Sequence, residues 1–228
     1  VRVLDLGSGQ ERAWSTADWR TPPAWIDGRL AFARAGKVWL SSAAQGEGTP
    51  SAFTGLPAIP AGARVRLSAQ GGVAWSDGAR LWVVPHPGQE PRPRAAEGQV
   101  LDFAWSPDGR RLAYVTASDG LSPTLWVADV SGERVPVRLA QGGAEVWSAP
   151  TWSPDGQRLA FSRAPLGAET ASASDVWLVD ADGEALRPLL RNHLEESSPA
   201  WSPDGRYLAF NRAGDVWVVD VTRPPAAP

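Results

Sequence analysis

The chain has 228 residues, 43% of them hydrophobic, with a formal net charge of −3 and no cysteine. This length suits one all-β domain or two smaller ones, and the missing cysteines exclude disulfides and thiolate chemistry. The charge balance indicates no nucleic-acid or anionic-membrane partner, and no run of about 18 apolar residues is present that could cross a membrane.

Two strands are predicted at the start of the chain. Val1–Leu6 has the same apolar pattern as Val216–Val221 near the other end, and Glu11–Thr16 is predicted to be the strand that follows it. No charged-then-apolar signal segment precedes Val1, so we expect the chain to be a mature or trimmed segment of a longer precursor.

Five apolar triplets centred on tryptophan recur along the rest of the chain. At least one β-branched residue flanks each tryptophan, which is typical of a strand in a well-packed sheet. The triplets are Val38-Trp39-Leu40, Leu81-Trp82-Val83, Leu125-Trp126-Val127, Val176-Trp177-Leu178 and Val216-Trp217-Val218.

A turn motif precedes each triplet. Its intact form, Trp-Ser-Pro-Asp-Gly, occurs three times, and degenerate copies begin at Trp25 and Leu67. Proline presets φ for a turn, aspartate can bond its own backbone, and glycine accepts the conformation that closes a hairpin. We therefore predict structural turns at Trp105, Pro107, Asp108, Gly109, Trp152, Pro154, Asp155, Gly156, Trp201, Pro203, Asp204 and Gly205.

Each full repeat is predicted to form four antiparallel strands. In the third repeat these are Val100–Trp105, Arg111–Thr116, Thr124–Val130 and Val135–Leu139. Repeats of this length and strand content are typical of propeller blades. The sequence thus predicts an all-β, five-bladed β-propeller over residues 1–221, with blades at about 20–55, 56–97, 98–140, 141–190 and 191–221 and an N-terminal strand within 1–16.

The last predicted blade has only three strands. We expect an N-terminal strand to lie against it and close the ring; the alternative is that the chain is a fragment of a propeller with six or more blades. Residues 222–228 are rich in proline and are predicted to be a linker or a disordered end.

The repeated turn, followed by Arg or Tyr, Leu, Ala and an aromatic residue and then by a Val-Trp-Val-Val-Asp type of strand, resembles the TolB-like β-propeller repeat family. The resemblance covers residues 1–221 and is strongest in the last three repeats. It implies a fold more specifically than a function, because the family includes periplasmic partner-binding propellers, lipoprotein sensor domains and propellers that gate prolyl-oligopeptidase-like peptidases. It also implies a periplasmic, cell-envelope or secreted location. TolB-type domains usually have six blades, and five are predicted here.

The repeated aspartates and tryptophans are interpreted as structural. One aspartate per blade, already used by its own hairpin, leaves the carboxylates too far apart to converge on a calcium ion. Tryptophans that recur at the same strand positions are most simply explained as core between adjacent blades.

The candidate binding residues lie in segments where the repeat breaks down. The segments that enter the innermost strands and the long loops between second and third strands share one face of a propeller, opposite the repeated turns, and long loops on a rigid scaffold commonly carry binding residues. An aromatic anchor with an acidic surround suits a basic or polar peptide-like partner. The residues are Glu145, Trp147, His193, Glu195, Glu196, Asp119, Leu121, Leu166 and Glu169.

No catalytic motif is found. Gly7-Ser8-Gly9 is not part of a nucleophile elbow, and His86 and His193 are the only histidines, too few for a three-histidine metal site. The sequence predicts a non-catalytic module without cofactor or metal that binds a protein or peptide and is part of a larger extracytoplasmic protein. The alternatives are a peptidase-gating propeller and a lyase or hydrolase that uses the channel, for which His193 with Glu195 or Glu196 offers acid/base groups.

Overall fold

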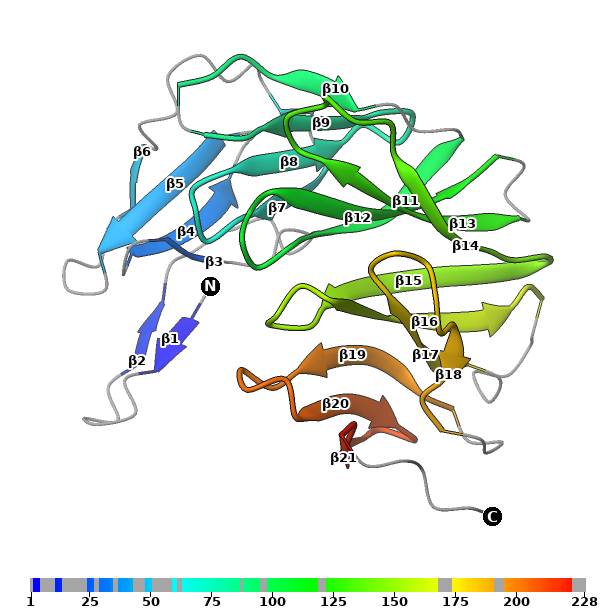
Figure 1. The fold of residues 1–228 in the computed structure, drawn as a ribbon. Coiled ribbons are helices and arrows are strands. Elements are labelled where there is room, and N and C mark those ends of the chain that lie inside the picture. Colours follow the sequence, from blue (N-terminus) through cyan, green and yellow to red (C-terminus); the bar gives the residue numbers. More distant parts are fainter. Residues whose placement is uncertain are drawn as a thin grey trace. The chain divides into compact units, whose positions relative to one another are not determined.

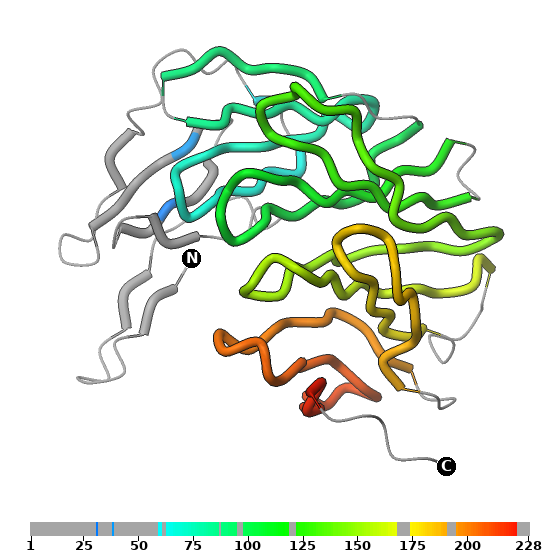
Figure 2. The backbone as a smooth tube through the Cα atoms, viewed as in Figure 1, coloured from blue at the N-terminus to red at the C-terminus, as the bar shows by residue number. Residues whose placement is uncertain are grey.

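The computed structural model describes residues 59–60, 63–86, 88–94, 98–118, 122–167, 174–190 and 195–222, together with six earlier strands between Arg2 and Pro50. All strand pairs in this part of the chain are antiparallel. Figure 1 shows these strands, and Figure 2 traces the same backbone as a tube. The described residues contain no helix long and apolar enough to cross a membrane.

The chain divides into two compact units, Val1–Arg94 and Ala95–Pro228. In the first unit, β1 (Arg2–Leu4) pairs with β2 (Glu11–Ala13) as a separate two-stranded sheet. Two four-stranded sheets follow, each in sequence order: β3 (Ala24–Ile26), β4 (Arg29–Arg34), β5 (Lys37–Ser42) and β6 (Gly48–Pro50), then β7 (Arg64–Leu67), β8 (Val73–Ser76), β9 (Leu81–Val84) and β10 (Arg92–Arg94). Val38, Val65, Val73 and Trp75 belong to one buried cluster, which packs these two sheets together.

The second unit contains three sheets, again with strands in sequence order. They are β11 (Gln99–Trp105), β12 (Arg111–Ala117), β13 (Pro123–Asp129) and β14 (Val137–Gln141); β15 (Glu145–Trp152), β16 (Arg158–Pro165), β17 (Asp175–Asp180) and β18 (Arg187–Pro188); and the three-stranded β19 (Ser197–Trp201), β20 (Tyr207–Arg212) and β21 (Asp215–Asp220).

Apolar side chains pack these three sheets face to face. Val115 and Leu125 of one sheet share a buried cluster with Trp147 and Phe161 of the next. Leu178 and Leu208 belong to a second cluster between the second and third sheets. The first strands of the sheets, β11, β15 and β19, lie next to one another (Figure 1), as the innermost strands of neighbouring propeller blades do.

Two bulges tie neighbouring sheets together through the backbone. Ala149 and Ser198 occupy the same place in β15 and β19, and both have a positive φ, 51° and 55°. The Ala149 N–H donates to Asp102 Oδ2 at 3.0 Å, and the Ser198 N–H donates to Ser162 Oγ at 3.0 Å. An acceptor on the preceding sheet therefore bonds an amide that the bulge turns out of its own ladder.

The predicted all-β class and antiparallel, propeller-like sheets are confirmed. The described strands of the third repeat match the predicted ones within a few residues at each end. The blade count, the extent of the domain and the closure of the ring stay predictions.

Candidate functional site

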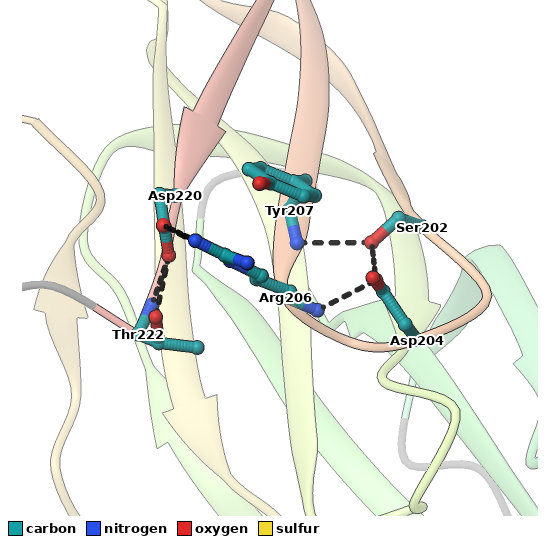
Figure 3. Close-up of polar contacts among 6 residues, drawn as sticks. All are labelled: Ser202, Asp204, Arg206, Tyr207, Asp220 and Thr222. Carbon is teal, nitrogen blue, oxygen red and sulfur yellow. Dashed lines mark hydrogen bonds and ion pairs between the residues drawn. The ribbon is translucent and has the colours of Figure 1, made fainter.

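The repeated turn is held together by its own side chains (Figure 3). In the last copy, the Ser202 hydroxyl donates to Asp204 Oδ1, the Arg206 N–H donates to the same oxygen at 3.0 Å, and the Tyr207 N–H donates to Ser202 Oγ at 2.9 Å. The other two intact copies repeat these bonds. Their last glycines have φ of 67° to 68°, which favours glycine at this place.

These bonds also stabilise the ionised carboxylates. The serine hydroxyl is the main cause that lowers the pKa of Asp155 and of Asp204, and the backbone amide adds to it. Burial works the other way at Asp108, but the Ser106 hydroxyl and the Arg110 amide outweigh it, so the pKa of Asp108 is also lowered. Each carboxylate is engaged within its own turn, and no group of three His, Cys, Asp or Glu side chains among the described residues could hold a metal ion.

The candidate site lies at the other end of the β15–β16 hairpin. Glu145 bridges two side chains there: its Oε1 accepts from Arg163 Nη2, and its Oε2 accepts from Trp147 Nε1 at 2.8 Å. The Arg163 guanidinium also lies over the Trp177 ring, 4.3 Å from its centre. Trp147 is 1% exposed and packs against Phe161 with ring centres 4.9 Å apart. Trp147 is therefore a core ring, in contrast to the aromatic anchor that the sequence predicts.

The next sheet carries a related pair, with its arginine at the equivalent strand position. Arg212 follows its strand aromatic, Phe210, by two residues, as Arg163 follows Phe161. Glu196 stands where β15 has Trp147, is fully buried, and accepts from Arg212 Nη2 at 2.6 Å. Arg163 and Arg212 thus compensate two of the predicted acidic residues, so the surface around them is much less acidic than the sequence indicates.

The opposite face of the same hairpin end is apolar and exposed. Val146 pairs with Ala164, and the Leu166 N–H continues the ladder by donating to the Ala144 carbonyl at 2.9 Å. This register places Val146 and Leu166 diagonally on one face, with Trp147 and Arg163 on the other. Val146 is 44% exposed and Leu166 is 41% exposed. We call these two side chains the hairpin patch.

The structure brings together only part of the predicted site. Glu145, Trp147 and Leu166 lie on one hairpin, but only Leu166 presents an exposed side chain. Glu195 is half-buried, and Glu196 pairs with the loop before β17 through its N–H to the Ser174 carbonyl. Asp119, Leu121, Glu169 and His193 lie outside the described residues.

Sequence reasoning missed Val146, Arg163 and Arg212. A signal for the two arginines was present, since each lies two residues after a strand aromatic of the repeat. No comparable signal marked Val146, because its exposure depends on how the sheets pack.

A protein-family model described as the TolB beta propeller domain matches residues 82–221, more than half of the chain. A search of curated protein sequences found no match.

Solved structures share the fold at low sequence identity. The structure of a putative TolB from Agrobacterium tumefaciens has a TM-score of 0.66 and 22% identity, covering 87% of this chain and 76% of that one. TolB from Acinetobacter baumannii has a TM-score of 0.63 and 19% identity over 96% of this chain and 56% of that one. A puromycin-hydrolyzing peptidase of Mycobacterium tuberculosis has a TM-score of 0.63 and 21% identity over 98% of this chain and 43% of that one. The chain thus spans about half the length of the last two.

Proposed function

The chain belongs to the TolB β-propeller domain family, and we propose that it is a non-catalytic module that binds a protein or peptide through the hairpin patch. The observation that carries this proposal is the contrast between the two faces of the β15–β16 hairpin end. One face is fixed by Glu145, Trp147 and Arg163, and the other leaves Val146 and Leu166 in solvent.

A fixed hairpin favours binding because little conformational entropy is lost when a partner docks. The Glu145 bridge orders the side chains of Arg163 and Trp147 before any partner arrives. Burial of Val146 and Leu166 against a partner then makes the free energy of binding more favourable, by roughly 25 cal/mol per Å² of apolar area buried. Two half-exposed aliphatic residues supply a small anchor, which suits a peptide or a short loop of a partner protein.

The chemistry of the hairpin patch favours an apolar segment of the partner. Because Glu145 and Glu196 are both paired with arginine, they offer no free carboxylate to attract a basic peptide. We therefore expect hydrophobic side chains, with few charges, in the segment that contacts Val146 and Leu166.

A displayed peptide library, selected against the chain, tests this proposal. We expect the selected peptides to be apolar at their contact positions and to bind the V146D/L166D variant at least tenfold more weakly than the wild type. The matched control is Val135→Asp, since Val135 is 86% exposed and lies outside the strands. Thermal unfolding of each variant checks that the fold is retained.

Two outcomes would contradict the proposal. One is that selection yields no binder, and the other is that the selected peptides bind V146D/L166D and wild type equally. Gating of a peptidase domain and catalysis in a channel stay predictions, because likenesses below 25% identity carry the fold alone.

We further propose a periplasmic, cell-envelope or secreted location, as part of a larger protein. The support is the family resemblance. Fractionation of the source cells followed by detection with an antibody against the chain checks it, and recovery in the cytoplasmic fraction would contradict it.

A further inference from the structure

The outer edge of β21 is open in the part of the chain that the structure describes. There, β5, β9, β13 and β17 each pair with a fourth strand, whereas β21 pairs with β20 alone. Val216, Trp217 and Val218 are 72%, 48% and 62% exposed, while Val176 and Leu178 at the equivalent places of β17 are buried. An apolar edge strand is a ready site for another strand.

The backbone groups of Val216 and Val218 point out of this edge. The Val221 N–H donates to the Arg206 carbonyl, just before β20, at 2.9 Å. Because backbone groups point to alternate sides along a strand, those of Trp217 also face β20, and those of Val216 and Val218 face away from it. The N–H and C=O groups of both valines are therefore offered to an incoming strand.

The fourth strands of this chain show which residue fits opposite the central tryptophan of the third strand. It is proline in three sheets and arginine in the other. The pairs are Trp39 with Pro50, Trp82 with Pro93, Trp177 with Pro188, and Trp126 with Arg138.

The contacts of β17 and β18 explain this choice. The Leu189 N–H donates to the Val176 carbonyl at 2.7 Å, so the neighbouring pair of Trp177 and Pro188 exchanges no backbone bonds. Proline, which has no N–H to donate, is tolerated at such a place on an outer strand. Leu189 is 4% exposed and belongs to the buried cluster of Val176 and Leu178. A proline followed by an aliphatic residue thus satisfies both the backbone and the packing of this edge.

The charge on the edge of β21 adds a third requirement. Asp215 is exposed and lies two residues before Trp217, so an antiparallel partner places the second residue after its proline opposite Asp215. Opposite charges directly across a strand pair stabilise it, which favours lysine or arginine there. Asp220, at the other end of β21, already accepts hydrogen bonds from Arg206 and Thr222 (Figure 3).

We propose that β21 binds an extended segment of a partner protein as the fourth strand of its sheet, in antiparallel orientation. The segment carries proline opposite Trp217, an aliphatic residue opposite Val216, and lysine or arginine opposite Asp215. Backbone hydrogen bonds hold the segment, and the side chains on either side of its proline set the specificity. This surface is additional to the hairpin patch, and the proposal does not depend on that patch.

A second copy of the chain is a poorer occupant than such a segment. Two-fold pairings that keep the backbone bonds of Val216 and Val218 are centred on Trp217 or on Val218. They set Val219 or Val221 opposite Asp215, so neither brings a basic group to this carboxylate.

A synthetic peptide tests the proposal. Its sequence, Ala-Leu-Arg-Pro-Leu-Lys, copies Ala185–Leu189 and ends with the lysine meant for Asp215. In NMR hydrogen exchange with the full chain, we expect the peptide to slow the Val216 and Val218 amides at least several-fold and to leave the Trp217 amide nearly unchanged. No binding at peptide concentrations up to about 1 mM would overturn the proposal.

Two N-methylated peptides test the backbone pairing. The N–H of the leucine after the proline should donate to the Val216 carbonyl, whereas the N–H of the following lysine should face solvent. We expect N-methylation of that leucine to weaken binding at least tenfold and N-methylation of the lysine to weaken it less than twofold. Equal effects of the two modifications would overturn strand pairing in this register.

A charge exchange tests the position of the lysine. We expect Asp215→Lys to weaken binding of the lysine peptide about two- to fivefold, and a peptide with glutamate in place of its lysine to recover the loss. Asp215 is exposed, so the variant should keep the fold. Independence of the two changes would overturn the assigned register.

The other possible occupants give different results. Val216 and Val218 amides that exchange as slowly as the Trp217 amide in the chain alone would show an edge already covered within the chain. A dimer that Val218→Asp dissociates would assign the edge to a second copy. Loss of peptide binding in V146D/L166D would assign the peptide to the hairpin patch. Each of these results would overturn the proposal, and we expect V146D/L166D to bind the peptide as the wild type does.

Discussion

The guanidinium of Arg111 lies over the ring of Trp152, with Cζ 4.6 Å from the ring centre, and so joins two neighbouring sheets. Arg111 Nη2 also donates to the Gly156 carbonyl at 2.7 Å. The next pair of sheets repeats the contact, with Arg158 over Trp201 at 4.9 Å. The arginine that follows one turn motif thus binds the tryptophan of the next.

Replacing Arg111 tests how much this contact stabilises the unit. Arg111→Ala removes a cation–π contact worth about 0.5–2 kcal/mol and a charged hydrogen bond of similar size. We expect the free energy of unfolding to fall by about 1–3 kcal/mol, measured by urea denaturation. Arg111→Lys should recover only part of the loss, because an ammonium cannot stack as a planar group.

The matched control for that experiment is Arg110→Ala. Arg110 is the adjacent residue of the same turn and is exposed, so its loss should change the free energy of unfolding by less than about 0.5 kcal/mol. Equal effects of the two substitutions would contradict a bridging role for Arg111.

A pair of glycine variants separates backbone strain from this contact. Gly156 and Gly205 have nearly the same φ, 67° and 68°, so an alanine costs similar strain at both. A Cβ on Gly156 would lie 3.0 Å from Arg111 Nη2, whereas one on Gly205 would be 3.5 Å from Pro154 Cδ. We expect Gly156→Ala to lower the melting temperature more than Gly205→Ala does. The difference should vanish when both are made with Arg111→Ala, and a difference that persisted would contradict this reason.

Acid should weaken the repeated turns. The Ser153 hydroxyl and the Gln157 amide hold the pKa of Asp155 below its ordinary value of 3.8. A carboxyl with a lowered folded-state pKa stabilises the fold fully above the unfolded-state pKa, and this contribution is lost as the pH falls below 3.8 through the folded-state pKa. We expect Asp155→Asn to lower stability at pH 7 and to lose less further stability than the wild type between about pH 5 and pH 3. Urea unfolding at both pH values checks this, and equal losses would contradict it.

The two glutamate–arginine pairs should contribute unequally to the free energy of unfolding. Glu196 is 0% and Arg212 11% exposed, whereas Glu145 and Arg163 are 18% and 28% exposed. Glu196→Ala leaves a buried guanidinium without its carboxylate and should cost about 3–5 kcal/mol, against about 1–2 kcal/mol for Glu145→Ala. Chemical denaturation of both variants measures this.

An apolar replacement checks the cause of that difference. The double variant E196L/R212M removes the uncompensated charge and should recover part of the loss caused by Glu196→Ala. A double variant less stable than Glu196→Ala would contradict the explanation.

Much of the fold could be predicted because its information is local. The family resemblance read from Trp-Ser-Pro-Asp-Gly is confirmed by the family match over residues 82–221. Each copy of the motif closes a hairpin with bonds between residues at most five apart, such as Ser153 with Asp155 and Arg158 with Ser153. Hydrogen bonds between residues this close in the sequence recur wherever the same residues recur.

The candidate site could be predicted only in part, because exposure is a property of the packed sheets. Trp147 and Leu166 both stand where the repeat breaks down, yet Trp147 lies in the core between two sheets and Leu166 lies in solvent. The partners of Glu145 and Glu196 come from 18 and 16 residues farther along the chain, on the second strands of their sheets.

The sequence by itself determined the strands, the turns and the order of the repeats, since turn chemistry and two-residue alternation act over a few residues. Only the tertiary structure decided which side chains of the loop-bearing end are buried. Register and sheet packing placed Trp147 against Phe161, compensated Glu145 and Glu196 with arginines, and left Val146 and Leu166 exposed. These outcomes depend on residues from separate strands meeting in space, which no local pattern encodes.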